Sequence, residues 1–243
     1  MGRGRYYNWG YPPYVPVAEK KANAQKIIAR LSKTNPGLAP VVIEGRKLAK
    51  TWWGTAWNKN LENYADYAYR IGRGSAYVKN GMVVDLQISG GNVTGLVCGS
   101  ESKPYSVQIT VEQMSAGKWK KLLAQCSQRI GSVGELTEGK FPEDLKDLFL
   151  GKDSGLFPSP REIHIQCSCP DWAVLCKHAA AVLYGIGARF DQDPLLFFEL
   201  RSVLFEELLA KSLDAKMNSM LKNAGKKTLR VLEVDDISKV FGV

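Results

Sequence analysis

The segment CSCPDWAVLCKHAA, residues 167–180, constrains this chain more than any other stretch, because it gathers three of the five cysteines and one of the two histidines. The four side chains are Cys167, Cys169, Cys176 and His178. Structural zinc takes four soft or borderline donors in a tetrahedron, and Cys₃His is one of its usual sets. Pro170 and Asp171 favour a turn that curls the first pair of ligands around one ion. The segment therefore predicts one structural Zn²⁺ bound by these four side chains.

Other uses of the cluster fit its spacing less well. A redox dithiol normally separates its cysteines by two residues, whereas Cys167 and Cys169 have one residue between them. A catalytic thiol with His178 as its base lacks an evident Asn or Asp to orient the ring, and four protein ligands leave a metal no open position. The other histidine, His164, alternates with Ile163 and Ile165, so we expect an exposed strand residue there instead of a fifth ligand.

Positive charge is concentrated at the start of the chain. The first 50 residues contain ten Lys or Arg and two acidic residues, whereas the remainder contains 23 basic and 22 acidic residues. Basic residues interleaved with Tyr and Trp suit phosphate contact and base stacking, although a solvated tail followed by a Lys-rich helix has the same composition. The candidate nucleic-acid or partner contacts in this part are Arg3, Arg5, Lys20, Lys21, Lys26 and Arg30.

Further candidate contacts lie elsewhere. They are Arg70, Arg73, Arg161, Trp172 and Lys177. Three thiolates and one Zn²⁺ carry a net charge of −1, so the cations that flank the cluster either offset that charge or touch a phosphate. The two arginines of RIGRG either contact a phosphate backbone or belong to a basic turn before a hairpin.

Hydrophobic periodicity predicts an α+β fold, in which an antiparallel β-meander packs with helices beside a small ββα zinc unit. The aromatic stripe that includes Trp53 and Trp57 is predicted to be core. The meander is expected over residues 75–111, with Asn80-Gly81 and Gly90-Gly91-Asn92 as its turns. Helices are expected over residues 17–31, 112–131, 142–150 and 175–190, and one or two more over 193–225. The predicted divisions are an arm and helix (1–37), an α+β domain (38–150), the finger (151–190) and a helical region with a tail (191–243).

Composition also bears on location. No run of 18 apolar residues exists, and the first residues lack the apolar centre of a signal peptide. Five cysteines are too few and odd in number for a disulfide framework. We therefore expect a cytoplasmic protein with no membrane partner, and no small-molecule substrate is evident.

The pattern CxCx₆CxH followed by an apolar helix resembles the SWIM zinc finger, with Cys167, Cys169, Cys176 and His178 at its ligand positions. Stretches such as TWWGTAWNKNLENYADYAYRIGRG and the closing DDISKVFGV extend the resemblance to bacterial SWIM zinc finger proteins over most of residues 38–243. The resemblance implies a ββα module that binds DNA or protein partners, in association with helicase-like ATPases of the remodeller type. The chain has no GxxxxGK[ST] loop, so such an ATPase would be the partner.

These observations predict a non-enzymatic zinc-binding accessory protein that binds nucleic acid, DNA or RNA, and a partner such as a helicase-like ATPase. The alternative is a protein-docking module with a structural zinc and no nucleic-acid binding, which would use the finger and the helix LLFFELRSVLFEELL. We expect its apolar run Leu195–Phe198 to belong to the core; the other possibility is that it fills a groove on a partner. An enzyme fits least, because HExxH, paired carboxylates and a nucleophile elbow are all missing from the sequence.

Overall fold

The structure is a computed structural model, and it describes residues 15–62, 68–127, 129, 143–151, 155–171 and 173–224. Its helices are α1 (Val17–Leu31), α2 (Trp52–Glu62), α3 (Ala68–Lys79), α4 (Ala116–Cys126), α6 (Lys146–Leu150), α7 (Lys177–Gln192), α8 (Leu196–Leu200) and α9 (Phe205–Ala224). Its strands are β1 (Val83–Ser89), β2 (Asn92–Val97), β3 (Tyr105–Val111) and β4 (Ile163–Cys167), with short 3₁₀ turns at Glu143–Leu145 and Pro160–Glu162. The predicted contacts Arg3, Arg5 and Trp172 and the predicted tail lie outside the described residues.

The strands form one antiparallel sheet in the order β1-β2-β3-β4. A two-residue turn joins β1 to β2, with φ of 51° at Gly90 and 78° at Gly91. Two consecutive positive φ angles define a type I′ hairpin turn, which favours glycine. β4 pairs with β3 from Val107 opposite Cys167 to Val111 opposite Ile163. The predicted meander is thus confirmed from β1 onward, and the strand of the finger extends it.

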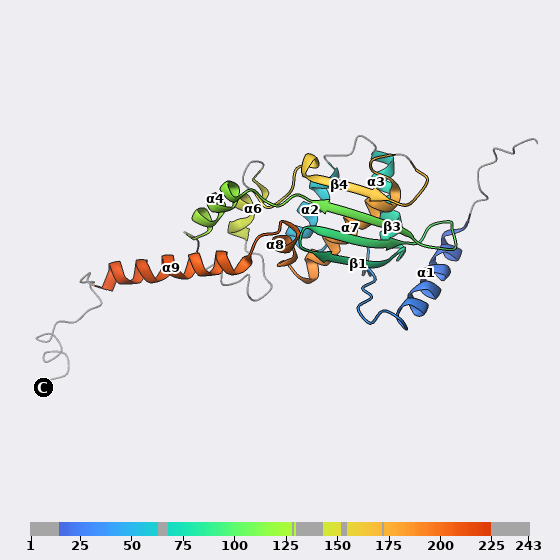
Figure 1. Ribbon diagram of the computed structural model, residues 1–243, viewed down its shortest axis with the longest axis horizontal. Helices are drawn as coiled ribbons and strands as arrows, with labels where there is room; N and C mark the ends of the chain where they lie inside the picture. Colours follow the sequence, from blue (N-terminus) through green and yellow to red (C-terminus); the bar gives the residue numbers. More distant parts are fainter. Residues whose placement is uncertain are drawn as a thin grey trace, which may run out of the picture.

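Helix α7 lies across one face of this sheet, and α2 and α3 cover the opposite side of α7 (Figure 1). Small residues allow this close packing. A Cβ added at Gly185 of α7 would lie 2.7 Å from Leu86 of the sheet, and one added at Gly187 would lie 2.6 Å from Asn58 of α2. Helix α7 is therefore held between the sheet and α2, and Ala179, Ala180 and Ala181 in its first turns are buried.

The predicted first strand of the meander is wrong. SAYVKN ends helix α3 instead, and Asn80-Gly81 stops this helix. Gly81 has a φ of 69°, its N–H bonds the Val78 carbonyl at 3.0 Å, and the next N–H, of Met82, bonds the Tyr77 carbonyl at 3.0 Å. This is a Schellman cap. Asn-Gly favours the left-handed backbone conformation found both in helix C-caps and in hairpin turns. Burial of helix α3 against α7 favours the helix over the hairpin.

The aromatic stripe of α2 is core, as predicted. The Trp57 side chain is 0% exposed, and its indole N–H donates to the Leu183 carbonyl at 2.8 Å. The Trp53 indole donates to the Phe190 carbonyl at 2.7 Å. Both acceptors lie on α7, so α2 is tied to α7 by hydrogen bonds as well as packing.

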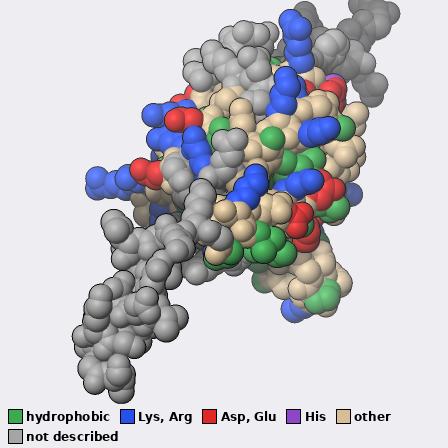
Figure 2. All heavy atoms as spheres, turned by 90° about the vertical axis from the view of Figure 1, so that its left-hand side faces the viewer, with side chains coloured by type: hydrophobic (Ala, Val, Ile, Leu, Met, Phe, Trp, Pro, Cys, Tyr) green, Lys and Arg blue, Asp and Glu red, His purple; other side chains and the backbone are tan. Residues whose placement is uncertain are grey.

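Helices α4, α6 and α9 form one end of the molecule, and α8 lies between them and the sheet (Figure 1). The Trp119 indole of α4 donates to the Glu207 carboxylate of α9 at 2.6 Å. Phe197 and Phe198 are each 2% exposed, which confirms that the predicted apolar run belongs to the core. Figure 2 shows this end of the molecule, where Lys and Arg side chains are spread over the face with acidic side chains among them.

Two glycines of α3 give a matched test of the α3–α7 contact. A Cβ at Gly74 would lie 2.4 Å from the Ala180 Cβ and 2.8 Å from its carbonyl carbon, whereas nothing lies within 4 Å of one at Gly72. We expect Gly74→Ala to lower the free energy of unfolding by about 1 to 3 kcal/mol, since rigid neighbours must move. Gly72→Ala should raise it by roughly 0.5 to 1 kcal/mol through helix propensity. Urea unfolding of both variants measures this, and equal effects would contradict the packing described.

Candidate metal centre

The four predicted ligands converge at the junction of β4, the loop that follows it and α7. Their ligand atoms all lie within 4.8 Å of one another. The sulfurs of Cys167 and Cys176 are each 4.0 Å from Nδ1 of His178. A tetrahedron with Zn–S bonds of about 2.3 Å and Zn–N bonds of about 2.0 Å has edges of roughly 3.5 to 3.8 Å. The donor set therefore fits one tetrahedral Zn²⁺, with the ligand atoms moving closer to one another by up to about 1 Å.

The backbone around the site explains why the ligands meet. Cys167 is the last residue of β4, and Ser168 donates its N–H to the Ser106 carbonyl at 2.9 Å. The Ser168 hydroxyl accepts from the Ser106 N–H at 2.9 Å, so strand β3 holds the first ligand arm. Cys176 is the N-cap of α7 and His178 lies in the first turn of this helix. The ββα unit is thus β3, β4 and α7, and its first strand lies far upstream of the segment assigned to the finger.

The thiols are electrostatically suited to a cation. The hydrogen bond from Cys167 lowers the pKa of Cys176 against the effect of burial, and His178 contributes in the same direction. The same hydrogen bond and burial raise the pKa of Cys167. The Cys176 sulfur also accepts from the Ala179 N–H at 3.4 Å, where the helix dipole favours negative charge. The cluster thus favours one thiolate and opposes the ionisation of a second thiol. A bound divalent cation would remove that opposition by neutralising the negative charge.

The imidazole of His178 is positioned by aromatic packing. Its ring centroid lies 4.4 Å from that of Tyr105 and 5.5 Å from that of Tyr77. Nδ1 faces the sulfurs, and Nε2 is buried without a hydrogen-bond partner in the described part of the chain. A Cβ at Gly99 would lie 2.6 Å from the Tyr105 ring, so glycine is needed there. Tyr77, Gly99 and Tyr105 thus position the imidazole, and no local spacing in the sequence links them to the cluster.

Arg70, a predicted phosphate contact, binds the finger loop instead of standing free. Its guanidinium pairs with the Asp171 carboxylate at 2.6 Å, which lowers the pKa of Asp171. The other carboxylate oxygen of Asp171 accepts from the Ala173 N–H at 3.2 Å. Asp171 therefore orders the turn between the two ligand pairs and fastens it to α3, a pairing across 101 residues that no sequence motif signals.

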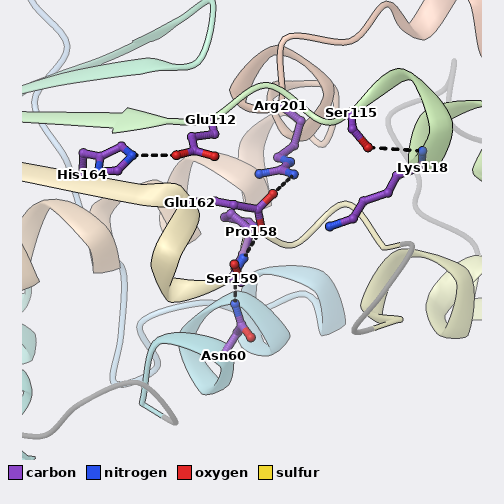
Figure 3. Close-up of polar contacts among 9 residues, drawn as sticks. All are labelled: Asn60, Glu112, Ser115, Lys118, Pro158, Ser159, Glu162, His164 and Arg201. Carbon is purple, nitrogen blue, oxygen red and sulfur yellow. Dashed lines mark hydrogen bonds and ion pairs between the residues drawn. The ribbon is translucent and has the colours of Figure 1, made fainter.

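His164 is not part of the cluster, as predicted. It lies on the exposed face of β4, where Nε2 contacts the Glu112 carboxylate at 2.9 Å (Figure 3). Both side chains are more than half exposed, at 59% and 55%. This pair therefore belongs to the polar outer face of the sheet.

A buried ion pair anchors the start of β4. The Arg201 guanidinium donates to the Glu162 carboxylate at 2.7 Å, and the two side chains are 1% and 17% exposed (Figure 3). The second oxygen of Glu162 accepts from the Ser159 N–H at 2.7 Å, which closes a capping box at Pro160–Glu162. Burial alone would raise the pKa of Glu162, but the hydrogen bonds from Arg201 and Ser159 lower it to about 2.

Fold and site together define a zinc-binding α+β protein whose metal ligands lie where a sheet strand meets a core helix. A family model for the SWIM zinc finger matches residues 149–185, which include all four ligands. The chain therefore contains a SWIM zinc finger, and the predicted resemblance and the single zinc are confirmed.

The flanking regions are also shared with a bacterial protein. The uncharacterized protein Rv2102 of Mycobacterium tuberculosis is 36% identical over 170 residues, which cover 70% of this chain and 61% of that protein. The chain thus matches about three-fifths of its relative's length. No solved structure matches the chain. Among the described residues, no helix is long and apolar enough to cross a membrane.

Proposed function

We propose that this protein is a non-enzymatic accessory protein that binds nucleic acid, with DNA as the first ligand to test, on a surface ordered by its zinc finger. The observation that carries the proposal is the position of the basic helix α1. Lys20 and Lys26 line a cavity of about 340 Å³ together with the loop from Gly99 to Ser102. Gly99 adjoins the zinc ligand His178. The basic segment and the finger, distant in the sequence, therefore share one surface.

Helix α1 presents its charges outward. Ala24 and Ile27 are buried against the body of the protein, whereas Lys21, Lys26 and Arg30 are exposed. Neutralising phosphates with such side chains releases counterions, which supplies affinity without sequence specificity. This helix is the element that would follow a nucleic-acid backbone.

The expected result is DNA binding that weakens steeply with salt. Each phosphate contact contributes a slope of about −0.9 to log K against log[salt] on duplex DNA. Replacing Lys21, Lys26 and Arg30 together by Gln should therefore make the slope shallower by up to about 2.7. Fluorescence anisotropy with a labelled DNA duplex, measured from about 50 to about 200 mM salt, tests this prediction. Binding that ignores salt, or no binding to DNA and RNA, would refute the proposal.

We also propose a protein partner, and the resemblance to bacterial SWIM proteins suggests a helicase-like ATPase. An apolar stripe on α9 favours such a partner. Leu213, Met217, Met220 and Leu221 are 52%, 61%, 62% and 70% exposed, at spacings that share one helix face. Affinity purification from the native host with and without nuclease tests this, because an ATPase that remains after nuclease treatment is held by protein contact.

A further inference from the structure

A cavity opens between the end of α8, the start of α9 and the turn that joins β1 to β2. Its volume is about 410 Å³, which is within the range of roughly 300 to 1,000 Å³ typical of ligand pockets. Gly90 of the hairpin turn forms part of its wall. The apolar residues that line it are Leu195, Phe198, Val203, Leu204 and Phe205.

Hydrogen bonds and close packing fix the walls of this cavity. The Gly91 N–H donates to the Glu199 carbonyl at 3.0 Å, and the Val203 N–H donates to the Phe198 carbonyl at 3.0 Å. Ser202 has a φ of 51°, and a Cβ added at Gly91 would lie 2.7 Å from its hydroxyl oxygen. The hairpin turn and the end of α8 are therefore held together, and the cavity is formed before any ligand binds. A preformed site loses little conformational entropy on binding.

The mouth of the cavity exposes apolar surface. The Leu204 side chain lines the cavity and is 60% exposed. Phe205, which also lines it, begins a row of apolar side chains at spacings of four residues along α9, namely Phe205, Leu209, Leu213, Met217 and Leu221. The last three are exposed. The cavity thus adjoins an apolar surface of the kind that marks a contact with another molecule.

Charge at the mouth indicates which molecule fits. Glu199 and Glu206 line the cavity and are exposed, and neither carboxylate has an ion pair or hydrogen bond to another described residue. No Lys or Arg lines this cavity, although the chain as a whole has a net charge of +9. Two uncompensated carboxylates beside an apolar pocket are complementary to an apolar side chain that is flanked by cations.

We propose that this cavity binds a segment of a partner protein in which a bulky apolar side chain is flanked by lysine or arginine. The apolar side chain enters the cavity against Phe198 and Leu204, and the flanking cations pair with Glu199 and Glu206. This inference rests on the proposed function, to whose protein partner it adds a binding site and the chemistry of the bound segment.

The first experiment titrates the full zinc-loaded chain with three short synthetic peptides that have blocked ends. Their sequences are Gly-Arg-Phe-Arg-Gly, Gly-Arg-Ser-Arg-Gly and Gly-Glu-Phe-Glu-Gly. The first peptide should bind and shift the amide NMR signals of Gly90, Ser202 and Phe205, and added salt should weaken its binding. The serine and glutamate peptides should bind at least about tenfold more weakly. Equal binding of the serine peptide would overturn the apolar anchor, and equal binding of the glutamate peptide would overturn the role of the two carboxylates.

Variants test the same site from the side of the protein. The double variant Glu199→Gln and Glu206→Gln should weaken binding of the Arg-Phe-Arg peptide by about threefold to tenfold and should reduce its salt dependence. Leu204→Ser should weaken binding as well. Asp214→Asn is the matched control, since it removes an exposed carboxylate from the same helix outside the cavity. All of these side chains are exposed, so urea unfolding should be unchanged. Native affinity in the double variant would overturn the proposal.

A second measurement separates this inference from the proposed function. The native protein and a triple variant, Glu199→Gln, Glu206→Gln and Leu204→Ser, are purified from the native host after nuclease treatment. An ATPase retained equally by both proteins would support the protein partner and overturn the cavity as its binding site. If the Arg-Phe-Arg peptide binds as expected and no ATPase is retained, the cavity stands and the ATPase is wrong. A native protein that is dimeric by light scattering and a triple variant that is monomeric would show that a second copy of this chain occupies the cavity, which would overturn the partner proposed here.

Discussion

Replacing Cys176 by Ser is expected to remove the single zinc and to lower the stability of the whole sheet domain. Structural zinc contributes roughly 10 to 16 kcal/mol in isolated finger peptides, while an entire domain is stable by about 5 to 15 kcal/mol. Here the metal joins the end of β4 to the start of α7, and both elements belong to the main core. We therefore expect a loss of at least about 5 kcal/mol in the free energy of unfolding.

Metal analysis, thermal unfolding and amide exchange measure this result. The native protein should carry one zinc, and a chelator should lower its Tm, whereas the same chelator should leave the Tm of Cys176→Ser unchanged. Exchange protection should fall in β4 and in the first turn of α7. A variant that keeps both stoichiometric zinc and the native Tm would show that Cys176 is not a ligand.

Removing the carboxylate of Glu162 is the second large effect expected. In Glu162→Gln the Arg201 guanidinium, 1% exposed, keeps its charge in the interior without a compensating anion. Breaking a buried pair from one side costs about 3 to 5 kcal/mol, so we expect a loss of about 3 kcal/mol or more at neutral pH. Urea unfolding measures the difference between native and variant proteins.

The pH dependence of that difference has a definite sign. The pKa of Glu162 is about 2 in the folded chain, below its ordinary value of 4.5. The stability it contributes is therefore fully present above pH 4.5 and is lost as the pH falls toward 2. The advantage of the native protein over Glu162→Gln should shrink below pH 4.5. Both proteins lose thiolate ligands in acid, which is why the difference between them is the quantity to compare.

The exposed pair beside it provides the control. Glu112 contacts His164 on the same sheet, but both side chains are more than half exposed (Figure 3). An exposed pair contributes about 0 to 1 kcal/mol, so Glu112→Gln should change stability by no more than that. Equal losses in the two variants would mean that burial does not determine the strength of the Glu162 contact.

Local patterns in the sequence predicted the zinc site and most elements. The helix of residues 17–31, the core role of Trp57 and the turn at Gly90-Gly91 all depend on neighbours within a few residues. SAYVKN has the composition of a strand before a hairpin turn, yet it ends helix α3, and its Asn-Gly caps that helix. The distinction came from tertiary packing, because Gly74 lies against Ala180, about a hundred residues away, and Val78 is fully buried.

The division of the chain at residues 37, 150 and 190 stays a prediction. The structure shows that β4 pairs with β3 across the second of these boundaries, so the finger shares its sheet with the preceding region. Cytoplasmic location, DNA binding and an ATPase partner likewise stay predictions.

By itself the sequence determined the metal and its ligands, because Cys167, Cys169, Cys176 and His178 are close enough in the chain for coordination chemistry to select them. Only the tertiary structure decided what surrounds them. It placed β3 beside the first ligand arm, Tyr77 and Tyr105 against the imidazole, and the basic helix α1 beside the finger. Such contacts join residues far apart in sequence. Each apolar face could be buried against several different partners, but only one arrangement of the elements buries all the faces at once.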